Sequence, residues 1–429
     1  MFFLLFIHFL SSAFAGEWTP PGGKIELRAG EFLTSTDDYP QSMGQGALKL
    51  ETSGSHENFS AKVSPVLTAN IQDLGDTKKT KYHLLSSELW ADYTSDKIDF
   101  TIGMAPVKWG AADGLNPTNG FRSFDLSDPI FPRELSQRQV SVRLHPGTDQ
   151  DIVFEGIYVP QGQTDILPFG GTGKIQPTDS RWGTVLPTAV DVNQGATVPL
   201  KYALQSAHHN PSSDFAGRVR FLQVNGWDYS VAAGQFRRKR AILSYRLTGD
   251  ANDPNLPLTV RIKPYYPRQD MIGGDASGTW NEYGLRFEAA QYLVKKSDRA
   301  FGYNSFIGSG GIDRLWENLL WDGSFYVNAT YVHVKNNKSS LYVKDSIDLA
   351  FTRSYGTLKT EYRLEKWTPG ADYLVTVNRS SVVNLYVRHE WSDALNLSLT
   401  ASFLNGNVNS GIGRLSGNHR LIGQLEYYF

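Results

Sequence analysis

The last nine residues, Leu421-Ile422-Gly423-Gln424-Leu425-Glu426-Tyr427-Tyr428-Phe429, decide the fold. Every second position, counted back from Phe429, is apolar or small, and the positions between them are mostly polar. Successive side chains of a β-strand point to opposite faces, so this alternation predicts a strand with one apolar, aromatic face and one polar face.

The same alternation recurs along the chain, whereas helical periodicity is almost absent. Segments of about ten residues with this pattern, separated by turns, are typical of a transmembrane β-barrel. The clearest examples begin at Ile25, Ile98, Leu258, Leu285, Leu358 and Leu395.

A soluble β-sandwich would show the same alternation, so further features are needed to distinguish the two folds. Trp and Tyr cluster at strand ends, as in an interfacial girdle. Some turns are minimal, as at Ser95-Asp96, Asn225-Gly226 and Ser392-Asp393, while other connections are long and rich in Gly, Pro, Asn and Asp. We therefore predict an all-β fold, a transmembrane antiparallel β-barrel of about 16 strands, with 14 to 18 compatible with the pattern.

The first fifteen residues predict an export signal. Their apolar run ends in Ala13-Phe14-Ala15, the pattern of a signal-peptidase site, although no Lys or Arg precedes it. We expect residues 1–15 to be cleaved and residues 16–429 to form a single barrel in the outer membrane. Two long connections, at about residues 106–136 and 160–214, are expected to be loops at the extracellular rim. The short turns are expected at the opposite, periplasmic rim.

Composition excludes several classes of function. Lys and Arg total 42 against 43 Asp and Glu, which gives a net charge of −1 and no global basic footprint for nucleic acid. The chain has no Cys, so thiol catalysis, Cys-ligated metals and disulfides are excluded. The nine His are scattered and match no catalytic or metal-binding spacing. We therefore expect no enzyme activity, no cofactor and no metal site.

The first long connection carries a distinctive motif. A strand ending near Met104 is followed by Trp109-Gly110-Ala111-Ala112-Asp113-Gly114-Leu115-Asn116-Pro117-Thr118 and by the segment Asp125–Pro129. Over residues 98–138 the chain resembles a broad group of bacterial outer-membrane barrels related to porins and alginate-export proteins. The resemblance implies an outer-membrane channel or an export or uptake barrel, without implying a substrate.

Further partners are expected at the ends and rims of the barrel. The terminal aromatic strand resembles the C-terminal signature of bacterial outer-membrane proteins, which implies recognition of the strand ending in Phe429 by the barrel-assembly machinery. Outer-membrane lipid and lipopolysaccharide are expected to surround the barrel. The run Arg237–Arg240 is either a site for lipopolysaccharide phosphates at the outer rim or a plain solvated loop. The sequence leaves the oligomeric state open.

The candidate functional residues lie in the first loop and on the polar strand faces. Asp113, Asn116 and Asp125 can hold backbone donors, so we expect the stretch from Trp109 to Arg133 to fold into the lumen as a constriction. Contact of Trp109 or Asp113 with solute is an alternative to a purely structural role. The other residues expected to line the lumen are Arg143, Arg218, Arg220, Arg261, Arg286, Glu288, Glu361 and Arg363.

These features together predict a porin-like channel for small hydrophilic or anionic solutes. The local basic excess at Arg143, Arg218 and Arg220 favours anions, unless these charges only pair across neighbouring strands. One alternative is an export or uptake barrel for a polysaccharide or hydrophobic compound, which should show aromatic rungs at residues such as Trp90 and Tyr326. The other is an enzyme or structural barrel with a plugged lumen.

Overall fold

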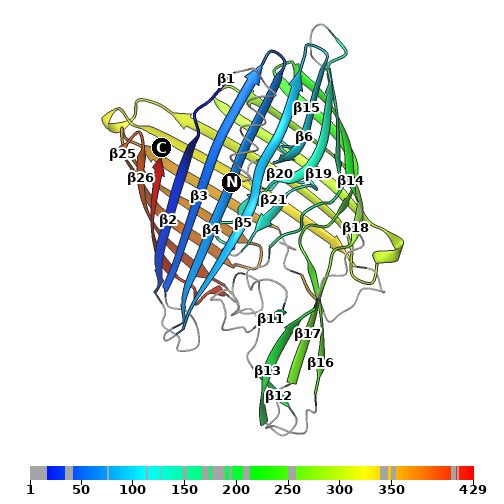
Figure 1. Ribbon diagram of the computed structural model, residues 1–429, viewed down its shortest axis with the longest axis vertical. Coiled ribbons are helices and arrows are strands. Elements are labelled where there is room, and N and C mark those ends of the chain that lie inside the picture. Colours follow the sequence, from blue (N-terminus) through cyan, green and yellow to red (C-terminus); the bar gives the residue numbers. More distant parts are fainter. Residues whose placement is uncertain are drawn as a thin grey trace.

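The chain forms a closed antiparallel β-barrel with a smaller sheet beyond one rim (Figure 1). The computed structural model describes residues 17–33, 42–74, 77–112, 115–126, 128–147, 152–166, 173–175, 189–192, 196–205, 213–249, 258–338, 346–348, 354–406, 412 and 415–429. The first strand of the ring, β2 (Gly22–Phe32), pairs with the last, β27 (Arg420–Tyr428), and this pairing closes the barrel.

In the described part of the chain the ring has 18 strands. Between β2 and β27 the ring strands follow in chain order, each antiparallel to the next: β3 (Ser42–His56), β4 (Phe59–Leu74), β5 (Thr77–Thr94), β6 (Ile98–Ala105), β9 (Gln137–Leu144), β10 (Ile152–Val159), β14 (Asp214–Val224), β15 (Trp227–Arg237), β18 (Arg268–Trp280), β19 (Tyr283–Val294), β20 (Asn304–Trp316), β21 (Ser324–Asn337), β23 (Tyr355–Arg363), β24 (Trp367–Thr376), β25 (Ser381–Ser392) and β26 (Leu395–Asn405). The short β1 (Glu17–Trp18) extends the sheet beside the end of β3.

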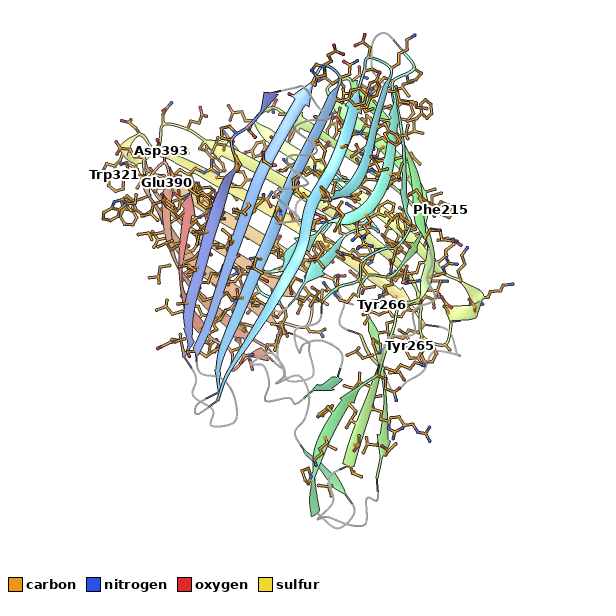
Figure 2. All side chains as sticks on the ribbon, in the orientation of Figure 1. Phe215, Tyr265, Tyr266, Trp321, Glu390 and Asp393 are labelled. Carbon is orange, nitrogen blue, oxygen red and sulfur yellow. The ribbon has the colours of Figure 1, made fainter. Side chains whose placement is uncertain are left out.

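The two faces of the wall differ as the alternation predicts. On β10, for example, Phe154 and Tyr158 point outward and are 45% and 47% exposed, while Val153 and Val159 point inward and are buried. The outward faces together form an exposed apolar band. Exposed tryptophans, including Trp280, Trp321, Trp367 and Trp391, lie at one rim, where Figure 2 shows Trp321 projecting from the barrel. Lipid is the environment that such a band and girdle fit.

The two rims also differ. The rim at which β2 begins and β27 ends, called here the near rim, has short connections, such as Glu57-Asn58, Asn225-Gly226 and Asn281-Glu282. Most connections at the opposite rim, called here the far rim, are long. Two 3-10 turns, η4 (Lys296–Asp298) and η5 (Leu320–Asp322), lie between ring strands. Among the described residues no helix has the length and hydropathy needed to cross a membrane.

The all-β barrel fold is confirmed, and its strand number lies at the upper end of the expected range. The alternation is weak in β20, because Gly308, Gly310 and Gly311 carry no side chain to mark a face.

The connections at the far rim build a second sheet, which the expectation of a single barrel with loops did not include. Its strands run in the order β11 (Gly173–Ile175), β13 (Ala196–Leu204), β17 (Leu258–Tyr265), β16 (Ile242–Thr248) and β22 (Ser346–Asp348), and β12 (Ala189–Val192) pairs with β13. The connection expected to be a loop at 160–214 therefore contains three of these strands. Figure 1 shows this sheet projecting away from the barrel, and Figure 2 places Tyr265 and Tyr266 at the junction.

Neither interpretation of the basic run Arg237–Arg240 matches the structure. Lys239 is buried and forms an ion pair with Asp214, and Arg240 donates to Asp165 over 2.8 Å. Burial lowers the pKa of Lys239 from its ordinary value, and Asp214 opposes that shift. Residues of this run therefore form internal ion pairs where the barrel meets the second sheet, and the run is neither an open lipopolysaccharide site nor a solvated loop.

Candidate functional site: the barrel lumen

The connection from β6 to β9 enters the barrel, and we call residues 106–136 the lumen loop. It contains the short antiparallel pair β7 (Ser123–Asp125) and β8 (Arg133–Leu135). Val107, Trp109 and Phe121 are buried in one cluster with inward-facing residues of five ring strands. Those wall residues are Ile157, Val159, Ala216, Ala232, Phe236, Met271, Ala290 and Tyr292. We call the inward faces of their strands, β10, β14, β15, β18 and β19, the covered wall.

Glu288 of β19 anchors the loop. Its carboxylate accepts hydrogen bonds from the backbone N–H groups of Ala111 and Ala112, both at 3.1 Å. It also accepts from the backbone N–H and the hydroxyl of Thr118, at 2.6 and 2.7 Å. Gly110 has φ +90°, and a Cβ there would lie 2.6 Å from both Glu288 oxygens, so glycine is required at this approach. Glu288 is on the inward face, but the loop covers it and leaves it 3% exposed.

A second anchor holds the far part of the loop. The guanidinium of Arg420 on β27 donates to both oxygens of Asp128, at 2.8 and 3.0 Å, and both side chains are buried. Phe131 lies between two cations, 5.3 Å from Arg28 and 5.1 Å from Arg420. The loop therefore crosses the barrel interior from the covered wall to β27 and β2. Sequence reasoning missed Arg420, although extending the alternation of the last strand by two residues places it on the polar face.

Close to the near rim, the carboxylate of Glu155 on β10 is surrounded by three arginines. Arg143 lies 3.0 Å from its carboxylate, Arg218 lies 2.5 Å away and Arg220 lies 3.7 Å away. The indole of Trp109 covers the guanidinium of Arg218 at 4.9 Å. Glu155 and Arg218 are buried, whereas the side chain of Arg143 is 55% exposed. We call these residues the Glu155 cluster.

Glu361 on β23 forms a matching arrangement, the Glu361 cluster. Its carboxylate accepts from Lys359 and Arg363, each at 3.1 Å, and pairs with Arg388. The Tyr386 hydroxyl also donates to it over 2.9 Å. Glu361 is buried, but the three basic side chains are 44%, 56% and 51% exposed. We call the inward faces of β23, β24 and β25 around this cluster the open wall. Toward the far rim the same strands are covered, because Ile130 of the lumen loop packs against buried Val382 of β25.

The two clusters face each other across the barrel. In the ring of 18 strands, β23 stands seven places from β10. Glu155 lies three residues from the start of β10 and Glu361 two residues from the end of β23, and both strand ends are at the near rim. Acidic groups flank both clusters in the strand register, because Asp99 lies opposite Arg143 and Asp372 lies opposite Lys359. Both Glu155 and Glu361 are buried, so the charged groups of the two clusters that remain partly exposed are basic.

A cavity of about 210 Å³ remains between the lumen loop and the wall formed by β2 to β5. Its charged lining is mixed and consists of Lys24, Glu26, Lys49, Glu88, Arg133 and Glu134. Arg133 is 3.8 Å from Glu26, so this expected lumen residue lies at the cavity.

The remaining expected lumen residues have various positions. Asn116 donates to Ala112 and accepts from Arg122, so it holds the shape of the loop, and Asp125 is buried in β7. Arg286 pairs with Asp313 on the inward side of the barrel. Asp113 lies outside the described residues. Arg261 was wrongly placed in the lumen, because β17 belongs to the second sheet and not to the barrel wall.

The fold and the lumen together define a porin-like β-barrel. Among solved structures, the chain is similar to OpdK of Pseudomonas aeruginosa, crystallised with vanillate, at a TM-score of 0.50 and 8% identity, covering 95% of this chain and 98% of that one. It is also similar to OccK5 (OpdH) of Pseudomonas aeruginosa (TM-score 0.49, 10% identity, 95% and 97% covered) and to a BenF-like porin from Pseudomonas fluorescens (0.49, 10%, 95% and 98%). No family model and no curated protein sequence matches the chain.

Proposed function

We propose that this protein is an outer-membrane channel that passes small hydrophilic solutes and prefers anions. The observation that carries the proposal is the pair of opposed clusters around Glu155 and Glu361, whose basic groups are partly exposed inside a closed barrel. Rings of one charge sign favour ions of the other sign. The exposed apolar band supports a membrane location, and the likeness to porins supports the fold that such a channel requires.

Export and assembly are parts of the same proposal. Residues 1–15 direct export and are removed, so the mature chain begins at Gly16, which N-terminal sequencing of the membrane protein tests. The assembly machinery recognises the terminal strand before the barrel closes. In the closed barrel, Phe429 exchanges backbone hydrogen bonds with Gly23, and its side chain remains 52% exposed on the outside.

The alternative of a lumen with aromatic rungs is less well supported. Trp90 and Tyr326 do share faces with Lys62 and Glu361 through the strand register, so both point inward. They lie on β5 and β21, which stand nine places apart in the ring of 18 strands. Two side chains on opposite walls do not make a continuous path for a hydrophobic compound.

Planar-bilayer recording of the refolded protein tests the proposal. We expect stepwise conductance and, in a salt gradient, a reversal potential that favours anions. Replacing Lys359, Arg363 and Arg388 together by Gln should reduce the anion preference, because Glu361 and Asp372 then remain without their cations. The matched control replaces Lys296, Lys335 and Arg379 by Gln. These three residues are exposed, lie at or near the far rim and belong to neither cluster, so selectivity should remain unchanged. An absence of conductance steps would contradict the channel, and unchanged selectivity in the first variant would contradict the role of the cluster.

A further inference from the structure

Four basic residues gather on one face of the second sheet. In the antiparallel register Arg246 lies directly opposite Arg261, and Ser244 opposite Lys263. In the parallel register of β13 and β17, Lys201 is level with Thr259 and shares this face. We call Lys201, Arg246, Arg261 and Lys263 the basic face. Three of them are exposed and Lys263 is partly exposed.

The opposite face of the same strands is apolar. Leu200, Tyr202, Val260 and Ile262 are buried there. The apolar face therefore supplies the packing that holds the small sheet together, and the basic face is not needed for that purpose.

No ion pair among the described residues involves any of the four members of the basic face, although the register places Asp191 opposite Thr197 and Asp348 opposite Ile242 at the edges of the same face. This differs from the lumen, where Glu155 and Glu361 neutralise part of each cluster. Two like charges directly opposite on neighbouring strands destabilise a sheet. The pairing of Arg246 with Arg261 is therefore an arrangement that folding alone disfavours, and an external anion would relieve it.

The position of the face bears on which anion it meets. Arg261 precedes Arg268, the first residue of β18 at the barrel rim, by seven residues. β17 ends at Tyr265, three residues before Arg268, so its basic residues lie beyond the end of the barrel wall. The face therefore belongs to the part of the protein that projects away from the barrel. Figure 1 shows the sheet projecting in that direction.

The side chains between the cations favour a sugar chain. Ser244, Thr248 and Thr259 alternate with the basic residues and provide hydroxyl groups. Single-stranded nucleic acids are usually bound by aromatic stacking platforms. The aromatic ring on this face, Tyr265, is already stacked on Phe301 at 3.7 Å.

We propose that the basic face docks an anionic polysaccharide chain outside the barrel. Its carboxylate or phosphate groups pair with Lys201, Arg246, Arg261 and Lys263, and its hydroxyls meet the intervening Ser and Thr side chains. The site lies outside the cell if the proposed membrane function holds, but the binding itself does not require channel activity.

The test uses the full-length barrel in neutral detergent and fluorescently labelled polygalacturonate, with dextran as the neutral polymer. We expect saturable binding of polygalacturonate that weakens as salt is raised, and no binding of dextran. Replacing Lys201, Arg246 and Arg261 by Thr, which suits exposed strand positions, should weaken binding by about tenfold or more. The matched control replaces Lys296, Lys335 and Lys366 by Thr, removes the same charge and should bind as the unmodified protein does.

Several outcomes would overturn the proposal. These are failure of polygalacturonate to bind, equal binding by both triple variants, equally tight binding of double-stranded DNA, and preference for phosphatidylglycerol vesicles over the polymer. Competition by monomeric galacturonate at equal concentration of sugar units would instead assign the face to solute capture. Conductance measured on the same variants separates the two proposals, because loss of polymer binding with unchanged conductance leaves the channel intact.

Discussion

The covered wall and the open wall carry the same kind of residue and use it differently. Glu288 and Glu361 are both buried carboxylates on inward strand faces, each 3% exposed. On the covered wall, backbone and hydroxyl donors of the lumen loop occupy the carboxylate of Glu288. On the open wall, Glu361 is held by basic side chains that remain half exposed. One glutamate therefore positions a loop, and the other shapes the field that a solute meets.

Of the changes that test the difference between the covered wall and the open wall, removal of part of the lumen loop should have the largest effect. Deletion of Ala111–Asn119 eliminates the segment bound by Glu288, so the covered wall becomes open and conductance in a planar bilayer should rise several-fold. A variant in which the same nine positions are replaced by Gly and Ser keeps the chain length and distinguishes lost anchoring from lost bulk. Unchanged conductance in the deletion variant would show that the loop does not limit flow.

The same substitution made on each wall should give different results. Glu288→Gln removes the charge that four donors share, and hydrogen bonds to charged groups are worth about 1.5–3 kcal/mol each, so the loop should loosen. We expect larger open-channel current fluctuations and a lower urea midpoint. Glu361→Gln should leave the fluctuations unchanged and increase the anion preference, because it removes a negative charge from a positive cluster. Identical behaviour of the two variants would remove the distinction between the walls.

The smallest expected effect concerns Trp109, where the covered wall meets the Glu155 cluster. Trp109→Phe weakens the stacking over Arg218, an interaction worth on the order of 1 kcal/mol. Arg218 should become more accessible, with a slight increase in anion preference and a modest loss of stability, because Trp109 is buried against Phe121. Reversal potentials compared with those of Trp227→Phe, a tryptophan at the rim, provide the measurement and its control.

The fold was predictable because the outward face of a membrane barrel must be apolar, and every spanning strand repeats that constraint. The second sheet was not, because Leu258, Val260 and Ile262 alternate with polar residues just as a spanning strand does. Periodicity records that one face is apolar but not whether lipid or protein covers it. For the same reason Arg261 was assigned to the lumen, although it lies on the second sheet.

In the lumen, too, the sequence pattern predicts which face a residue is on but not what covers that residue. Strand register placed Glu288 and Glu361 on the inward side, but only tertiary contacts reveal that a loop reaches the first and not the second. The motif around Trp109 indicated an ordered loop. Its anchors, Glu288 and Arg420, are distant in sequence, and no local pattern connects them to it.

The parallel pairing of β13 with β17 has a consequence for the order of folding. Parallel neighbours need a long crossover connection, and here the crossover consists of the β14–β15 hairpin of the barrel together with β16. The two strands therefore pair across a long intervening segment, and β22 joins from a connection much later in the chain. Non-local pairings of this kind form slowly. The small sheet is thus expected to form more slowly than the hairpins of the barrel wall, whose strands are neighbours in sequence.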